Sequence, residues 1–152
     1  MAEIVLAAYA KVNLTFDITG LLPNGYHSVE TVMQSVSLRD VVSMSKAGKG
    51  IHLSCNARYV PTDSRNLAYK AAELFFEKTG IPGGVEIGLR KKIPVQAGLG
   101  GGSSDAAAVL VGLNRLYKSG LSQEQLCEMG AALGADVPFC IMGGTKLGRG
   151  NG

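Results

Sequence analysis

A glycine-rich segment, residues 94–108 with the sequence PVQAGLGGGSSDAAA, is the feature that most constrains the fold of this chain. Its glycines allow positive φ and let a ligand approach more closely than a Cβ would permit. Apolar residues recur at helical spacing directly after it, and Ser103 and Ser104 are predicted as N-cap residues of the helix that follows. The first turn of a helix offers unpaired N–H groups and the positive end of the helix dipole, so the segment predicts a phosphate-binding loop.

Three other interpretations of the loop fit less well. The classical P-loop needs a lysine after its glycines, and none follows here. A dinucleotide-binding fingerprint nearly fits Gly98, Gly100 and Ser103, but Pro94 and three further residues separate the loop from the nearest predicted strand, residues 85–90. A flexible linker would not lead into a capped, amphipathic helix.

Composition excludes several classes of protein. The 152 residues predict one domain, and 46% hydrophobic with 18% charged residues is ordinary for a globular chain. A net charge of +3 without a basic stripe argues against nucleic acid as a partner, and no segment approaches the ~20 apolar residues of a membrane span. The three cysteines have neither disulfide-framework nor zinc-site spacing, so we expect a cytoplasmic protein. The basic run at residues 90–92 is interpreted as a solvated strand end, with phosphate steering as the alternative.

Hydrophobic periodicity predicts alternating strands and helices. Strands are expected at residues 3–18, 29–38, 40–45, 51–54, 85–90 and 137–142. In the first of these, Lys11 and Asn13 share a polar face that borders a solvent-filled cleft. A helix is expected to begin after residues 63–66, which offer several N-cap candidates, and to end at Gly80. Further helices are expected after the glycine loop through about residue 118, and from a capping box at residues 122–125 to residue 133.

The glycine-rich segment resembles the nucleotide-binding motif of the GHMP kinases. Three further stretches in the same order, AYAKVNL at residues 8–14, PNGYH at 23–27 and GADVPF at 134–139, are similar to one branch of this family. That branch phosphorylates the 2-hydroxyl of a cytidine diphosphate conjugate of methylerythritol in the non-mevalonate route to isoprenoids. The resemblance implies an α+β fold with a mostly antiparallel sheet and helices packed on one side.

The resemblance also implies which residues bind ATP. ATP chemistry implies Mg²⁺ as well, but no residue is assigned to the metal. Those residues are Pro94, Gly98, Leu99, Gly100, Gly101, Gly102, Ser103, Ser104 and, near the adenine, Asn66. On local grounds Asn66 is equally well explained as a helix cap.

The catalytic and substrate-binding residues follow from the same resemblance. Spacing alone favours an exposed strand lysine for Lys11, and local sequence explains Asp136 equally well as a turn or cap residue or as a functional carboxylate. The family pattern makes Asp136 the base and Lys11 its electrostatic partner. Asn13 would contact the small-molecule substrate, Tyr26 would stack on the cytosine, and His27 would recognise the polar edge of that base.

The chain also departs from the family pattern. GHMP kinases carry a second domain with a G-S-G-x-x-x-F motif that is missing from these 152 residues, so we expect an N-terminal domain without its C-terminal partner. Whether such a chain turns over alone is left open by the sequence, as is its oligomeric state. Two alternatives remain: a GHMP kinase for a different alcohol, and a non-catalytic nucleotide-binding module.

Overall fold

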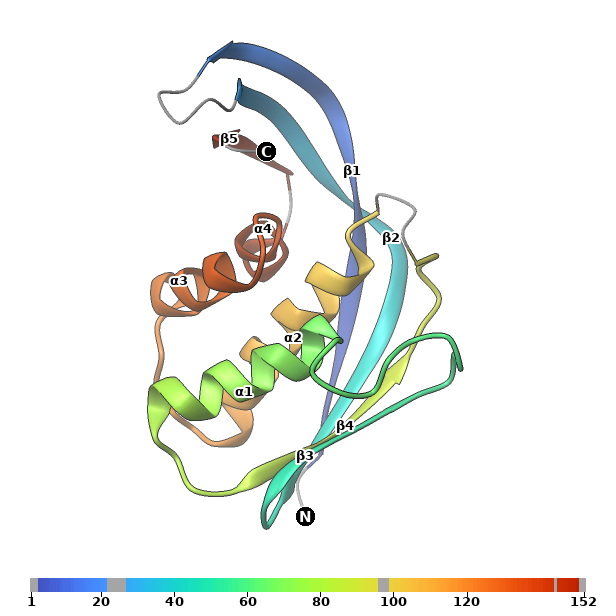
Figure 1. Ribbon diagram of the computed structural model, residues 1–152, viewed down its shortest axis with the longest axis vertical. Helices are drawn as coiled ribbons and strands as arrows, with labels where there is room; N and C mark the ends of the chain where they lie inside the picture. The colour runs from blue at the N-terminus through green and yellow to red at the C-terminus, as the bar shows by residue number, and fades with distance from the viewer. Residues whose placement is uncertain (1–2, 22–26, 96–98, 144, 151–152) are drawn as a thin grey trace.

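The computed structural model describes residues 3–21, 27–95, 99–143 and 145–150 of the chain (Figure 1). Three strands come first, and helices and the remaining strands follow, in an α+β arrangement. The elements are β1 (Glu3–Leu21), β2 (His27–Ala47), β3 (Gly50–Cys55), α1 (Leu67–Thr79), β4 (Gly84–Arg90), α2 (Gly101–Leu116), α3 (Gln123–Leu133), α4 (Val137–Met142) and β5 (Thr145–Gly150). In these ranges no helix is both long and apolar enough to cross a membrane.

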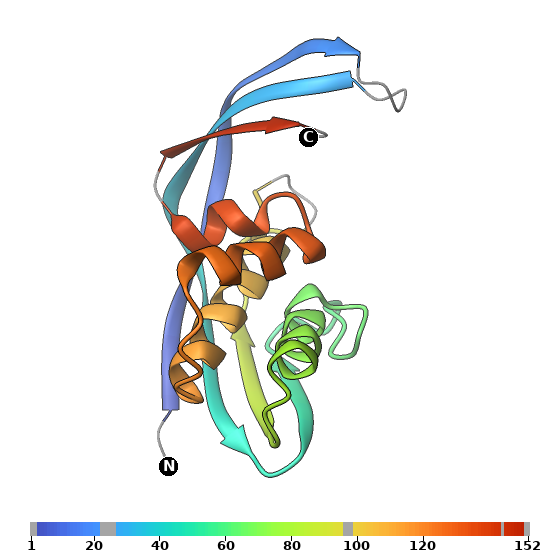
Figure 2. The same cartoon turned by 90° about the vertical axis from the view of Figure 1, so that its left-hand side faces the viewer.

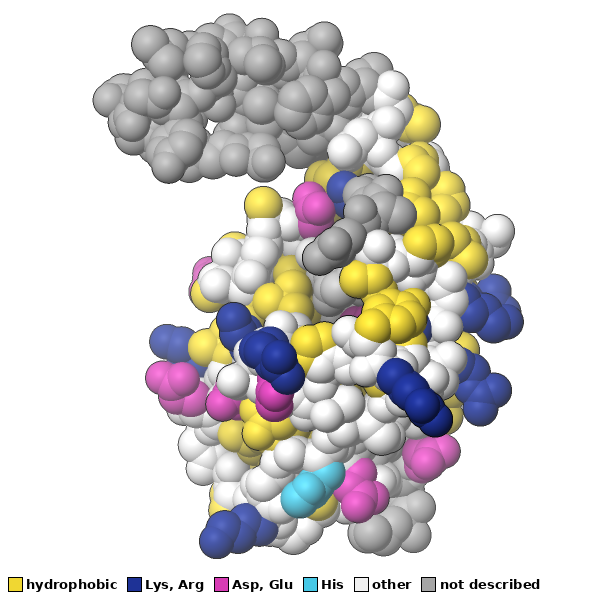
Figure 3. All heavy atoms as spheres, turned by 45° about the vertical axis from the view of Figure 1, so that its right-hand side comes forward, with side chains coloured by type: hydrophobic (Ala, Val, Ile, Leu, Met, Phe, Trp, Pro, Cys, Tyr) yellow, Lys and Arg dark blue, Asp and Glu magenta, His cyan; other side chains and the backbone are white. Residues whose placement is uncertain are grey.

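The sheet is mostly antiparallel, as the family resemblance implies. Its strand order is β1-β2-β4-β3, with β5 paired to the far end of β2, and among the described strands only the β3/β4 pair is parallel. β1 and β2 form a long, bent ribbon, and the four helices lie on its concave side (Figures 1 and 2). The other face turns away from the helices, and Figure 3 shows part of that surface, with hydrophobic side chains beside charged ones.

Two strand predictions need correction. Residues 29–38 and 40–45 form one continuous strand, β2, because Asp40 is fully buried within the sheet and does not turn the chain. The alternation expected in β1 also fails, since the pairing register shifts between Tyr9 and Lys11 and again between Asn13 and Thr15. These irregularities leave Lys11 buried and Leu14 59% exposed, which reverses the burial expected of both side chains.

The helix ends follow their chemical signals closely. Asn66 caps α1 by accepting a hydrogen bond from the Ala68 N–H, and Gly80 ends that helix in the left-handed conformation. The capping box of Ser122 and Gln125 opens α3, as predicted. Ser103 and Ser104 are not caps, however, because α2 already begins at Gly101, with Gly100 in the N-cap position.

The segment Val137–Met142 is a helix, α4, where the sequence predicts a strand. A short apolar run has no periodicity that separates the two. Pro138 lies in the first turn of α4, where a missing N–H loses no hydrogen bond and the fixed φ of proline is already helical. The turn into α4 places Asp136 at its N-terminal end.

The core lies between α2 and the sheet and fixes the position of the glycine loop. Val109, Leu110 and Leu113 of α2 are fully buried and belong to the same cluster as Val42 and Met44 of β2. A Cβ at Gly112 would collide with the Met44 side chain, so glycine permits the close approach of helix and strand. Burial of this helix face holds the N-terminus of α2 at the sheet, near β1.

Candidate functional site

The glycine loop meets the N-terminus of α2 at Gly100, whose φ of 71° is left-handed. A Cβ there would lie 2.8 Å from Lys11 Cγ, so only glycine fits both the conformation and the space. The loop is also bound to β1, because the Lys11 N–H donates to the Leu99 carbonyl at 2.8 Å. The loop and the first turn of α2 therefore rest against Lys11.

A cavity of about 420 Å³ lies beside this turn. It is bordered by Asn66 and by most of the residues that the sequence assigns to ATP. Those are Pro94, Leu99, Gly100, Gly101, Gly102 and Ser103. Its volume is that of a small-molecule site, and a Cβ at Gly102 would meet no atom within 4 Å, so the backbone there is open to a ligand.

Two of the assigned residues are not placed in this cavity. Ser104 is buried and borders a separate hollow together with Cys140 of α4. Gly98 lies outside the described residues.

Burial, with a smaller contribution from nearby Asp136, raises the pKa of the Cys140 thiol to about 12, so this cysteine is an uncharged packing residue.

Lys11 and Asp136, which are far apart in the sequence, form an ion pair with 3.2 Å between Nζ and Oδ2. The Lys11 side chain is only 8% exposed, whereas that of Asp136 is 36% exposed. Asp136 makes no capping hydrogen bond to α4, so its carboxylate is free to face Lys11 and solvent. The arrangement puts a buried ammonium and an accessible carboxylate at the edge of the glycine loop.

The residues predicted to bind substrate are only partly described. Asn13 is exposed on β1, two positions after Lys11. His27 begins β2 opposite Leu21, but its side chain, like the whole of Tyr26, lies outside the described residues. The cytidine-binding role of this pair stays a prediction.

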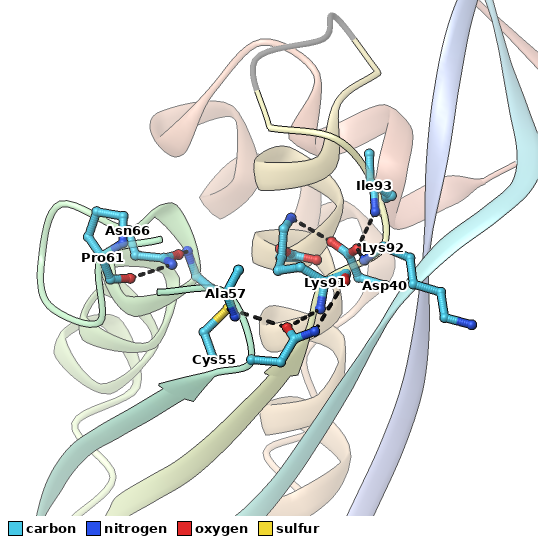
Figure 4. A network of polar contacts seen from close by, with 11 residues as sticks. Asp40, Cys55, Ala57, Pro61, Asn66, Lys91, Lys92 and Ile93 are labelled. Carbon is cyan, nitrogen blue, oxygen red and sulfur yellow. Dashed lines mark hydrogen bonds and ion pairs between the residues drawn. The ribbon is translucent and has the colours of Figure 1, made fainter. Parts of the chain in front are cut away.

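Sequence reasoning missed a second set of charged residues beneath the loop. Lys91 Nζ lies 2.6 Å from Asp40 Oδ2 (Figure 4). It lies 2.8 Å from Asp105 Oδ2, and all three side chains are almost completely buried. We call Asp40, Lys91 and Asp105 the buried charge cluster. The interpretation of residues 90–92 as a solvated strand end is therefore wrong for Lys91. One signal was available, because Asp105 lies four residues before Val109 on the apolar face of α2, where a charge needs a buried partner.

The two carboxyl groups of the cluster differ in their affinity for protons. Burial and a hydrogen bond to Asp40 raise the pKa of Asp105 to about 8, against the opposing effect of Lys91. For Asp40, burial acts to raise the pKa but is outweighed by hydrogen bonds from Asp105, the Ile93 N–H and Lys91, so its pKa is lowered. Asp40 is therefore the carboxylate of the cluster, and Asp105 tends to hold the proton.

A metal site is not evident in the described part of the chain. It contains no group of three or more His, Cys, Asp or Glu side chains that could hold a metal ion. The glycine backbone, the N-terminus of α2 and Lys91 border one cavity, an arrangement suited to an anionic ligand.

Comparison with known proteins points to one family. The family model described as GHMP kinases N terminal domain matches residues 66–144. The 4-diphosphocytidyl-2-C-methyl-D-erythritol kinase of Syntrophomonas wolfei is 52% identical over 150 residues, which cover 99% of this chain and 53% of that protein. Its counterpart in Clostridium botulinum strain Alaska E43 is 50% identical over 147 residues, covering 97% of this chain and 52% of the relative. The chain thus spans about half the length of these curated relatives.

Solved structures of kinases are also similar to this chain. A crystal structure of 4-(cytidine 5'-diphospho)-2C-methyl-D-erythritol kinase superposes with a TM-score of 0.86 at 42% identity, covering 98% of this chain and 53% of that one. The mevalonate kinase of Methanococcus jannaschii has a TM-score of 0.76 at 16% identity, over 99% of this chain and 55% of the other. At that identity the second likeness concerns the fold alone.

Proposed function

Because this chain belongs to the family of GHMP kinase N-terminal domains, we propose that it binds ATP and helps to transfer the γ-phosphate to the 2-hydroxyl of 4-diphosphocytidyl-2-C-methyl-D-erythritol. The observation that carries the proposal is the Lys11–Asp136 ion pair at the edge of the glycine loop. The three free cysteines are compatible with a reducing compartment, and we place the reaction in the cytoplasm, in isoprenoid synthesis.

In this proposal the N–H groups of the first turn of α2 bind the phosphates of ATP. Leu99 and Gly100 border the proposed phosphate site, and Gly102 leaves room for a phosphate oxygen beside the backbone. Gly98, outside the described residues, is kept as a predicted ATP-binding residue. Asn66, which borders the same cavity, would lie beside the adenine. ATP supplies the transferred phosphoryl group, and a Mg²⁺ ion bound with it would neutralise part of the phosphate charge.

Asp136 is the proposed general base. Its accessible carboxylate accepts the proton of the attacking hydroxyl, and the neighbouring Lys11 ammonium stabilises the negative charge that develops on the alcohol oxygen. Because Lys11 is almost fully buried, its charge is little screened by solvent. Asn13, Tyr26 and His27 are proposed to orient the acceptor, through a hydrogen bond, base stacking and recognition of the base edge respectively.

Calorimetric titration of the chain with 4-diphosphocytidyl-2-C-methyl-D-erythritol and with the ATP analogue AMP-PNP tests the proposal first. We expect saturable binding of both, with Tyr26→Ala weakening only the cytidine ligand, by about tenfold or more. If a folded chain binds AMP-PNP but not the cytidine ligand, the proposed substrate is wrong. Mevalonate and homoserine then serve as alternative acceptors.

Phosphoryl transfer, followed by chromatography of the product, tests the catalytic pair. Asp136→Asn and Lys11→Met should each slow transfer by about 100-fold or more while AMP-PNP still binds to Asp136→Asn. Glu128→Gln, an exposed carboxylate-to-amide change on α3, is the control and should transfer at the native rate. Transfer at the native rate by Asp136→Asn would remove Asp136 from the role of base.

A further inference from the structure

Both ends of the glycine loop meet at the buried charge cluster. Lys91 lies on the segment that enters the loop, just after β4, and Asp105 lies on α2, just after the loop. The Lys91 ammonium joins these two segments by binding the Asp105 carboxyl group. Its other partner, Asp40, belongs to the central strand β2. A single side chain therefore connects the entrance of the loop, its exit and the sheet.

Asp40 fixes the entrance of the loop through its backbone. Its Oδ1 accepts hydrogen bonds from the Lys92 N–H at 2.7 Å and the Ile93 N–H at 2.9 Å, while its Oδ2 accepts from Lys91 Nζ (Figure 4). Asn56 holds the preceding N–H, that of Lys91, at 2.7 Å. Three successive backbone N–H groups before the loop are thus held by side chains from other parts of the chain.

Lys91 lies directly beside the first residue of α2. A Cβ at Gly101 would be 3.2 Å from Lys91 Nζ, and Lys91 also borders the cavity. The ammonium is therefore packed against the helix end, and a change in its position would move Gly101 or open a gap next to it.

The charge of the cluster also matters for an anionic ligand. Two carboxylates and one ammonium would leave a buried negative charge near the proposed phosphate site, where it would repel the ligand. Asp105 Oδ1 has no hydrogen-bond partner among the described residues, and this carboxyl favours its neutral form. A proton on Asp105 makes the cluster neutral and leaves the positive end of the α2 dipole available.

We propose that Lys91, held between Asp40 and Asp105, is a positioning residue that joins the two ends of the glycine loop and fixes the loop in the geometry that binds phosphate. The inference rests on the proposed binding of ATP. Lys91 acts through the loop backbone, so its loss should affect the phosphate part of the ligand and spare the nucleoside part.

Lys91→Met and Lys92→Met form a matched pair for the test. Both remove one lysine charge, but the Lys92 side chain is exposed and extends away from the cluster (Figure 4). We expect Lys91→Met to weaken AMP-PNP binding by about tenfold or more and adenosine binding by no more than about threefold. Lys92→Met should bind both ligands with the affinity of the native chain. Equal losses for AMP-PNP and adenosine in Lys91→Met, or native binding of both, would overturn the proposal.

Asp40→Asn distinguishes positioning from direct contact with the ligand. Asp40 is fully buried and does not border the cavity, so it acts only through Lys91 and the segment before the loop. We expect its replacement to weaken AMP-PNP binding by about fivefold or more. A folded Asp40→Asn chain with native AMP-PNP affinity would mean that Lys91 is a ligand of the nucleotide and not a positioning residue.

Hydrogen exchange separates failure of this inference from failure of the proposed function. The Lys11 N–H to Leu99 carbonyl and the Ser104 N–H to Gly100 carbonyl hydrogen bonds, both 2.8 Å, report on the placement of the loop without any ligand. Their exchange should be faster in Lys91→Met than in Lys92→Met, even if the native chain proves to bind no AMP-PNP. Unchanged exchange in Lys91→Met refutes the positioning role independently of nucleotide binding.

Discussion

Replacing Asp105 by asparagine should change how the stability of the chain depends on pH. Asp105 is 2% exposed and faces the Lys91 ammonium and the Asp40 carboxylate, with the uncharged Cys140 thiol nearby. Its pKa is raised from the ordinary value of 3.8 to about 8, mainly by burial. The folded chain therefore holds a proton on this carboxyl that the unfolded chain releases.

The sign and size of the effect follow from proton linkage. A group whose folded pKa is raised stabilises the fold fully below its unfolded pKa of 3.8, and that contribution is lost as the pH rises through the folded value of about 8. With about 1.36 kcal/mol for each pH unit, the native chain should lose about 2 kcal/mol of unfolding free energy from this group between about pH 6 and about pH 8. The asparagine of the Asp105→Asn variant would contribute no such slope, because an amide does not titrate.

Urea unfolding of the native chain and of Asp105→Asn, followed by circular dichroism at several pH values in this window, measures the difference. Histidines and the other titrating groups are common to both chains, so their contributions cancel in the difference between the two unfolding free energies. Asp63→Asn is the control, because hydrogen bonds from Arg65 lower the pKa of Asp63 to about 2, well outside the window. Parallel stability curves for the native chain and Asp105→Asn would show that Asp105 is ionised in the folded chain and would refute the neutral cluster.

The remaining predictions concern residues that border the cavity. Gly102→Ala should raise the unfolding free energy by about 0.5–1 kcal/mol, because alanine favours a helix and its Cβ would contact no other atom. The same Cβ should weaken the binding of AMP-PNP by about tenfold, and native AMP-PNP affinity would mean that no phosphate approaches Gly102. Gly100→Ala, by contrast, should lower the stability measured by urea unfolding by roughly 1–2 kcal/mol from the left-handed φ alone. Asn66→Ala should lower stability by about 1 kcal/mol or more, because it removes both the α1 cap and the hydrogen bond that the Asn66 amide donates to the Pro61 carbonyl. Asn66→Ser loses the second bond but keeps a capping oxygen, so equal losses in urea unfolding would contradict the cap.

The parts of the fold that sequence predicts well are those whose chemistry is local. Asn66, Gly80 and Ser122 mark helix ends because their side chains or φ angles act within one turn of their own position. In Val137–Met142 the local signal is Pro138, which suits the first turn of a helix but also the start of a strand, so we attribute the helix to its packing against α2 and α3. The continuity of β2 through Asp40 is equally hard to predict, because the partners that stabilise this buried aspartate lie 51 to 53 residues further along the chain.

The same distinction between local and long-range contacts decides which parts of the site can be predicted from sequence. The glycine loop before a helix is predictable from spacing, because both features are contiguous in the chain. The pairing of Lys11 with Asp136 follows from family resemblance and not from the residues themselves, and the structure confirms only that the two side chains meet. The prediction for Lys91 is wrong because a lysine at the end of a strand is usually solvated, and nothing local shows that two carboxyl groups lie next to it.

The ion pairs on the two sides of the loop differ in exposure, and the difference separates their roles. A carboxylate that takes a proton from a bound alcohol must be reachable, and Asp136 is 36% exposed while its partner Lys11 is not. A carboxylate that fixes backbone must exclude water, and Asp40 is fully buried with each oxygen occupied. Because both oxygens of Asp40 are hydrogen-bonded, the Lys91–Asp40 pair is suited to hold the loop still, whereas the exposed Asp136 beside Lys11 is suited to act on a bound ligand.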